Sequence, residues 1–231
     1  MAAIDKVKII VVGDSGVGKT SLTHLICEQQ TINNPSWTVG CSVEVKLHEF
    51  KEGTPNQKRY FIELWDIGGS QSHKNTRHVF YNPTNGIILV HDLSNRKSQQ
   101  NLQKWLEEVL SRDGNSGRSR SFDDFDPEKF VGLTQIPILV VGTKLDLVPS
   151  KSNLHRRSST IAEECGADEI FLDCSQVRSL AAGTTSSVKL SRFFDKVIER
   201  RYYANREVIS PDKRRQPVYA SSYSPKLYHR D

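Results

Sequence analysis

The stretch from Gly13 to Ser21, GDSGVGKTS, constrains this chain more than any other part of its sequence. It matches the pattern G-x-x-x-x-G-K-[ST], follows an apolar, β-branched run and precedes a segment with helical hydrophobic spacing. A strand, a glycine-rich turn and a helix start are the context in which this pattern binds phosphate. The alternative is an ordinary glycine-rich turn between a strand and a helix, but the match together with both flanks favours phosphate binding.

The chemistry of such a loop follows from its backbone. Successive N–H groups and the N-terminus of the following helix face the phosphate oxygens. Lys19 would place an ammonium group beside the β- and γ-phosphates, and the Thr20 hydroxyl would ligate Mg²⁺. The residues expected at the phosphates are Ser15, Gly16, Val17, Gly18, Lys19, Thr20 and Ser21.

Apolar runs that read as strands alternate with segments that read as helices. A Gly- and Pro-containing loop at 51–57 separates two of these strands, which predicts an antiparallel hairpin at the sheet edge. The pattern therefore predicts an α/β fold with a doubly wound, mostly parallel six-stranded sheet that has one antiparallel edge strand. The expected strands are 6–13, 41–50, 58–67, 86–93, 136–146 and 169–175, and the expected helices are 21–29, 70–81, 98–111, 152–165 and 188–203.

Length and composition suit one intracellular domain. The 231 residues predict a single domain over 1–205, with a polar insertion at 112–135, and a flexible tail over 206–231. The four cysteines form no C-x-x-C pair, which indicates reduced thiols rather than a zinc site. No apolar run is long enough to span a membrane, and the net charge of +5 favours solvated basic faces over a nucleic-acid patch.

Two further motifs follow predicted strands, where ligand groups gather in open α/β sheets. In Asp66-Ile67-Gly68-Gly69, the Asp66 carboxylate could hold Mg²⁺ and the Gly69 N–H could reach a γ-phosphate. Thr143-Lys144-Leu145-Asp146 is similar to N-K-x-D, in which a carboxylate at Asp146 would accept two hydrogen bonds from guanine and select GTP over ATP. Taken alone, each stretch could instead be an ordinary surface turn.

In combination, GDSGVGKTSL, WTVG, ELWDIGG and VVGTKLD resemble a Ras-superfamily small GTPase of the atypical Rab-like kind, over roughly residues 5–203. The resemblance implies a P-loop GTPase fold with GTP or GDP and Mg²⁺ as cofactors. It implies that Thr38 is the switch I threonine that closes on Mg²⁺ and the γ-phosphate, and that 70–81 is switch II. Thr38 could otherwise be a plain threonine at the start of a strand, and Trp37 either an exposed partner anchor or a core residue.

The chain departs from the family pattern in its presumed catalytic and base-binding positions. Ser70 stands where the family has its water-positioning glutamine, and Gln71 would need a backbone shift to replace it, so we expect slow intrinsic hydrolysis with these two as the catalytic candidates. Thr143 replaces an asparagine, which predicts a weaker tether of the base loop. Ser175 and Gln176 occupy the S-A-K position without its lysine, and the last cysteine is Cys174, so no prenyl anchor is expected on this tail.

These features predict a GTP/GDP-binding molecular switch that recruits effector and regulatory proteins through switch I and switch II, in signalling or protein transport. One alternative is a partner-activated GTPase of vesicle traffic. Another is a scaffold that self-associates as a homodimer through Trp37 and Phe80, with nucleotide mainly stabilising the fold. We expect a cytoplasmic protein that reaches membranes only through partners and binds no nucleic-acid polymer.

Overall fold

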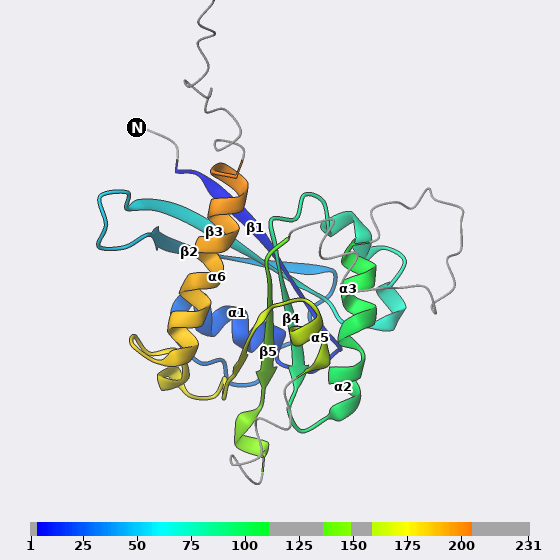
Figure 1. Cartoon of the computed structure of the whole chain (residues 1–231). Coiled ribbons are helices and arrows are strands. Elements are labelled where there is room, and N and C mark those ends of the chain that lie inside the picture. The colour runs from blue at the N-terminus through cyan, green and yellow to red at the C-terminus, as the bar shows by residue number, and fades with distance from the viewer. Residues whose placement is uncertain (1–3, 111–135, 149–158, 205–231) are drawn as a thin grey trace, which may run out of the picture.

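The computed structural model describes residues 4–110, 136–148 and 159–204. In these residues a six-stranded sheet runs in the order β2-β3-β1-β4-β5-β6 (Figure 1). Its strands are β1 (Lys6–Val12), β2 (Cys41–Phe50), β3 (Lys58–Ile67), β4 (Gly86–Asp92), β5 (Ile138–Thr143) and β6 (Asp168–Phe171). The described helices are α1 (Lys19–Glu28), α2 (Arg96–Gln100), α3 (Leu102–Leu110), α5 (Thr160–Glu164) and α6 (Thr185–Tyr202).

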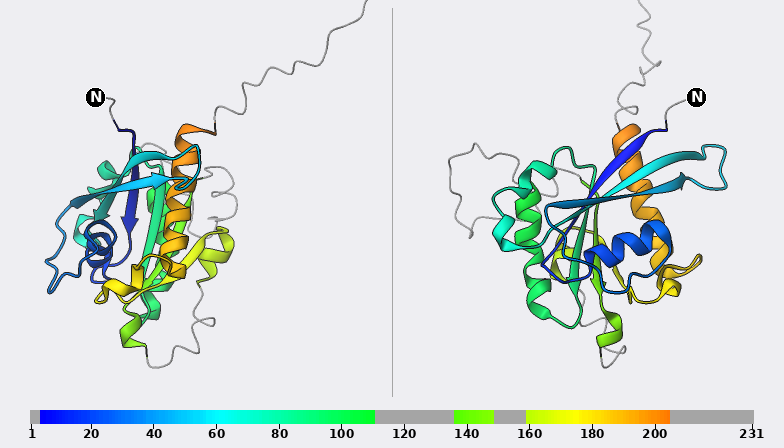
Figure 2. Two further views of the ribbon diagram at one scale, coloured as in Figure 1. Left: turned by 90° about the vertical axis from the view of Figure 1, so that its left-hand side faces the viewer. Right: turned by 180° about the vertical axis from the view of Figure 1, so that it is seen from behind.

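The sheet has the predicted topology. Strand β2 pairs antiparallel with β3 from Cys41–Ile67 to Phe50–Lys58, and the other neighbouring strands all pair in parallel. Figure 2 shows the β2–β3 hairpin projecting from one edge. The expected doubly wound sheet with one antiparallel edge strand is therefore confirmed.

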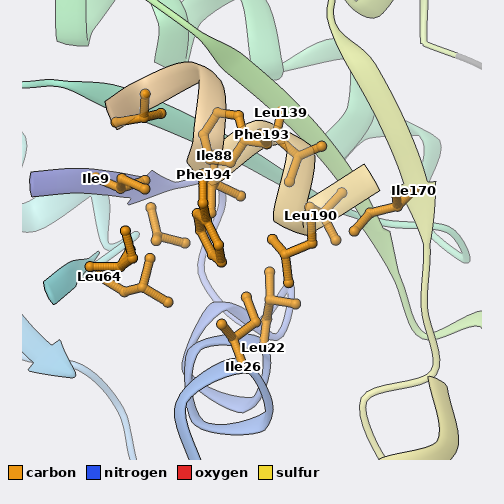
Figure 3. Close-up of a cluster of buried hydrophobic side chains, with 14 of the residues drawn as sticks. Ile9, Leu22, Ile26, Leu64, Ile88, Leu139, Ile170, Leu190, Phe193 and Phe194 are labelled. Carbon is orange, nitrogen blue, oxygen red and sulfur yellow. The ribbon is translucent and has the colours of Figure 1, made fainter. Parts of the chain in front are cut away.

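Helices α1 and α6 cover one face of the sheet. Leu22 and Ile26 of α1 meet Phe193, Phe194 and further side chains of α6 over the sheet (Figure 3). The strand residues beneath them come from β1, β3, β4, β5 and β6 and include Ile9, Leu64, Ile88, Leu139 and Ile170. The apolar residues of α6 that are buried include Leu190, Phe193, Phe194 and Val197.

Helices α3 and α5 cover the opposite face. Trp105 and Leu106 of α3 pack with Ile161 of α5 on β-branched residues of β1 and β4. Because β1, β4 and β5 are covered on both faces, they consist almost wholly of apolar residues, as buried parallel strands require. These two layers place the carboxyl ends of the strands at one rim of the domain.

Two expected helices differ from their predicted form. The helix over 98–111 is two helices, α2 and α3, separated by Asn101, whose side-chain amide donates to Asp14 on the phosphate loop. The segment 70–81 forms two 3-10 turns, Gln71–His73 and Arg77–Phe80, in place of one short helix. It has no apolar face of helical period, and its one buried residue in these turns is the charged Arg77.

Several predictions fall on parts of the chain that the structure does not describe. The insertion at 112–135 and the tail at 206–231 lie outside the described residues. The first half of the helix expected over 152–165 lies outside them too, and α5 lies in its second half. No helix in the described ranges has the length and apolarity needed to cross a membrane.

Candidate functional site

The backbone between β1 and α1 is a loop that glycine makes possible. A Cβ on Gly13 would lie 2.1 Å from the carbonyl oxygen of Val90 on β4, so only glycine fits there. Gly18 caps α1 in the left-handed region, with φ near +93°, a conformation that side chains disfavour. The loop therefore wraps closely on β4 and leads directly into the N-terminus of α1, whose first N–H groups have no partner within the helix, as a phosphate-binding loop requires.

Lys19 lies inside this loop. Its buried Nζ donates to the carbonyl oxygens of Gly13 and Asp14, each at 2.9 Å. Burial lowers the pKa of its ammonium group to about 8, while the nearby Asp66 carboxylate acts in the opposite direction. An ammonium group has three N–H donors, so one remains for an anionic ligand beyond the two carbonyl contacts found among the described residues.

Three oxygen-bearing side chains from distant segments meet beside the loop. Thr20 donates to Asp66 Oδ2 at 2.6 Å, Thr38 donates to the same oxygen at 3.0 Å, and the two hydroxyl oxygens lie 3.0 Å apart. Asp66 is only 1% exposed, and burial raises the pKa of its carboxyl group. Within the described residues its Oδ1 is buried without a hydrogen-bond partner.

These residues fit a divalent cation. Hydroxyl and carboxylate oxygens are the donors that Mg²⁺ prefers, and a buried carboxylate with an unpartnered oxygen needs a positive counter-charge. The three ligands predicted from the sequence, Thr20, Thr38 and Asp66, are therefore brought together by the fold.

The turn after β3 packs directly on the phosphate loop. A Cβ on Gly69 would lie 2.5 Å from the Ser15 nitrogen and 2.7 Å from the Gly13 carbonyl oxygen, while one on Gly68 would lie 2.6 Å from the Thr38 carbonyl oxygen. Both glycines are thus required by close backbone approach. This contact brings the D-x-x-G turn to the loop and to the Thr38 segment at once.

A cavity of about 350 Å³ opens between these segments. Ten of the residues that the sequence assigned to the site line it, together with Pro35, Ser36 and Trp37. The ten are Ser15, Gly16, Gly18, Lys19, Thr20, Ser21, Thr38, Gly69, Ser70 and Lys144. Val17 does not line the cavity, because its side chain is buried in the core beneath the loop.

The base-binding candidates lie at and beyond the rim of this cavity. The buried Thr143 hydroxyl lies 2.5 Å from the Val17 carbonyl oxygen and 3.0 Å from that of His91, so threonine ties β5 to the phosphate loop. Lys144 is bonded to Asp92, with 2.7 Å between Nζ and Oδ2, and has a positive φ. Asp146 is exposed, so its carboxylate is open to a ligand rather than held by the fold.

Ser175 and Gln176 are organised by an aspartate that the sequence reasoning missed. The backbone N–H and hydroxyl of Ser175 donate to Asp173 Oδ1 at 2.9 and 2.5 Å, and the Gln176 amide donates to the other oxygen. Asp173 is buried, and its position at the end of the last strand was the available signal. Neither Ser175 nor Gln176 lines the cavity.

The two catalytic candidates differ in place. Ser70 borders the cavity, and its hydroxyl lies 2.7 Å from that of Ser72. Gln71 is exposed at the start of a 3-10 turn and does not border the cavity. Among the described residues, no amide side chain lines the cavity.

Trp37 and Phe80, the two aromatic residues expected at a partner surface, differ in their exposure to solvent. Trp37 is 82% exposed, so the exposed alternative is the correct one, and Val39 beside it is 78% exposed. Phe80 is half-buried and packs against the α3 side of the core, which makes it a poor surface anchor.

Comparison with known proteins gives a consistent picture. The family model described as Ras of Complex, Roc, domain of DAPkinase matches residues 8–118. Rab-like protein 3 of Xenopus tropicalis is 57% identical over 209 residues, which cover 87% of this chain and 88% of that protein. Rab-like protein 3 of Homo sapiens is 53% identical over 225 residues, covering 93% and 95%. Small GTPase LIP1 of Arabidopsis thaliana is 40% identical over 152 residues, covering 62% of this chain and 42% of that protein.

Proposed function

The chain belongs to the Rab-like small GTPases of the Ras superfamily, and from this membership we propose that it is a GTP/GDP-controlled switch that recruits protein partners in its GTP-bound state. Its role lies in intracellular signalling or trafficking, and it acts in the cytoplasm, reaching membranes through its partners. Its intrinsic hydrolysis of GTP is slow.

One observation carries this proposal. Thr38 bonds Asp66 at the metal site, while the neighbouring Trp37 and Val39 are strongly exposed. A ligand that engages Thr38 therefore changes the position of an exposed apolar surface on the same short segment. Partners that read this surface would distinguish the two nucleotide states.

In this proposal, different residues bind the phosphates, the metal ion and the base. The backbone of the phosphate loop and Lys19 hold the phosphate oxygens, and Gly69, which also lines the cavity, offers its N–H to the γ-phosphate. Thr20, Thr38 and Asp66 would hold Mg²⁺, which would supply positive charge to offset that of the phosphates. The exposed Asp146 carboxylate accepts from the guanine edge and disfavours adenine.

Slow hydrolysis follows from the short side chain at Ser70. A serine hydroxyl at the rim cannot reach as far toward an attacking water as an amide side chain, and here it already lies within hydrogen-bond distance of Ser72. The protein would then spend most of its time as a nucleotide-bound binding module rather than as an efficient enzyme.

Hydrogen exchange of the 31–40 backbone tests the switch directly. We expect stronger protection with Mg²⁺ and a non-hydrolysable GTP analogue than with Mg²⁺ and GDP, because Thr38 then has a ligand to close on. Chromatography of the nucleotide released on denaturation supports guanine specificity when GTP or GDP is found. Equal protection in both states would remove the switch proposal.

Self-association is a second candidate, favoured by the exposed Trp37 and Val39. A switch with protein partners and a self-associating scaffold predict different masses in solution. Light scattering of the purified protein should show a Trp37-dependent dimer in the second case, with Trp37→Ser shifting the mass to that of a monomer.

A further inference from the structure

Arg77 is a buried charge that the nucleotide site described above does not use. It is 2% exposed and lies on the segment after β3, yet its side chain points away from solvent into the layer beneath α3. Burying a guanidinium without partners is costly, so its contacts must be accounted for.

The partners of Arg77 come from α3. Its Nε and Nη2 donate to the two carboxylate oxygens of Glu108 at 2.5 and 2.6 Å, a two-pronged pair that fixes the plane of the guanidinium. The Tyr81 hydroxyl donates to the same carboxylate at 2.6 Å, and the guanidinium carbon lies 4.0 Å from the centre of the Trp105 ring. The Arg77 side chain is thereby held in one orientation.

The third arm of the guanidinium reaches the nucleotide site. Nη1 donates to the backbone carbonyl oxygen of Ser70 at 3.2 Å, and Ser70 borders the cavity next to Gly69. Gly69 packs on the backbone of Ser15 and Gly13, so the turn is held on the phosphate loop at Gly69 and by Arg77 at the next residue, Ser70.

Helix α3 and Asn101, the residue before it, also hold the phosphate loop. The Trp105 indole N–H donates to one carboxylate oxygen of Asp14, and the Asn101 amide donates to the other, each at 2.8 Å. Trp105 thus touches Arg77 with its ring face and Asp14 with its N–H. These contacts form a continuous ring, which we call the Trp105–Arg77 contact ring. It runs from Asp14 to Trp105 and Arg77, then to Ser70, and returns to the phosphate loop through Gly69.

We propose that Arg77 is a positioning residue of the nucleotide site: through the Ser70 carbonyl it holds the Gly69–Ser70 segment of the turn beside the cavity, so that the Gly69 N–H can meet a γ-phosphate, and α3 fixes Arg77. This inference rests on the proposed function, because it assigns the γ-phosphate to the Gly69 side of the cavity. GDP has no γ-phosphate, so a loosened Gly69–Ser70 segment weakens the binding of the triphosphate more than that of GDP. A merely structural role for Arg77 would weaken GDP and GTP equally.

The test compares affinities for GDP and for a non-hydrolysable GTP analogue, both with Mg²⁺, in the full chain. Arg77→Gln and Glu108→Gln should each lower the ratio of analogue to GDP affinity by about tenfold, the order of a typical coupling between sites. Arg59→Gln is the matched control, because it removes an exposed guanidinium on β3 that pairs with Glu49, and it should leave the ratio unchanged.

The fluorescence of Trp105 reports directly on the Trp105–Arg77 contact ring. In a Trp37→Phe, Trp65→Phe background, Trp105 is the one tryptophan of the chain. The analogue should change its emission, and adding Arg77→Gln should abolish that change. If Arg77→Gln fails to fold by circular dichroism, the isosteric Glu108→Gln decides both readouts.

The outcomes are distinct. An unchanged affinity ratio in folded Glu108→Gln and Arg77→Gln, or an emission change that persists without Arg77, overturns the positioning role and leaves the proposed function intact. Wild-type protein that binds neither nucleotide overturns the proposed function together with this inference.

Discussion

At the scale of single residues, the site depends on small side chains and on oxygens placed within 3 Å of one another. Gly13, Gly68 and Gly69 are needed because backbone from another segment occupies the space of their Cβ atoms. Asp66 is needed because two threonine hydroxyls donate to its carboxylate. We therefore expect substitutions at these positions to weaken ligand binding by displacing the backbone or the oxygen atoms of the site.

Replacing Ser70 with glutamine should accelerate hydrolysis. The longer amide side chain can reach from the cavity rim toward an attacking water, and we expect single-turnover GTP hydrolysis to rise about tenfold, equal to about 1.4 kcal/mol of barrier. His73→Gln, which places an amide at an exposed position of the same turn, is the control and should leave the rate unchanged. An unaltered rate in Ser70→Gln would show that Ser70 does not limit the reaction.

Replacing Thr20 with asparagine should weaken Mg²⁺-dependent binding of GTP. The change removes the hydroxyl that bonds Asp66 at 2.6 Å, and a hydrogen bond to a charged group contributes about 1.5–3 kcal/mol, so we expect at least a tenfold loss. Affinity is measured with and without Mg²⁺ by calorimetry. Thr160→Asn, at an exposed helix start, is the matched control, and an equal affinity in Thr20→Asn would remove Thr20 from the metal site.

At the scale of elements, local sequence predicted strands better than it predicted the segments around switch II. Strands β1 to β6 lie where their apolar runs indicated, because their periodicity reflects burial on one or both faces. The 3-10 turns over 71–80 could not be foreseen, since they are held by the side-chain contacts of Arg77 with α3 rather than by an apolar face. The break at Asn101 has a similar origin in its bond to Asp14.

Helix α6 offers a test of one element through its N-terminal cap. The Thr184 hydroxyl accepts from the Ser187 N–H at 3.2 Å, satisfying a donor that the helix leaves open. Thr184→Ala should lower the free energy of unfolding by about 1 kcal/mol in urea titrations, whereas Thr184→Ser should stay close to wild type. Equal stabilities for both variants would mean that the cap contributes nothing.

At the scale of the whole molecule, the C-terminal helix is tied to the β2–β3 hairpin at the sheet edge. His48 of β2 lies 2.8 Å from Asp195, the ring of Phe50 stacks on Tyr203 with centroids 5.4 Å apart, and the hydroxyls of Tyr60 and Tyr203 lie 3.0 Å apart. These contacts join residues about 140 positions apart. They hold the hairpin at the end remote from the nucleotide site.

A double-mutant cycle measures this long-range tie. Tyr60→Phe and Tyr203→Phe each delete one hydroxyl while keeping the ring, so their coupling isolates the hydrogen bond. We expect a coupling of about 1 kcal/mol in the free energy of unfolding, the usual net worth of a hydrogen bond. Additive effects of the two substitutions would show that the hydroxyls do not interact in solution.

The sequence by itself determined the family and the sheet, and its motifs contain most of the residues that the fold brings together around the cavity. These are written in contiguous motifs, because a phosphate loop or a D-x-x-G turn places its groups through neighbouring backbone, and burial leaves its period in each strand. Only the tertiary structure decided that Trp37 is exposed, that Thr143 holds the phosphate loop, and that Asp14 and Arg77 meet on Trp105. The physical reason is that exposure and side-chain pairing depend on segments distant in the chain: the Asp14 carboxylate and the indole that bonds it are 91 positions apart.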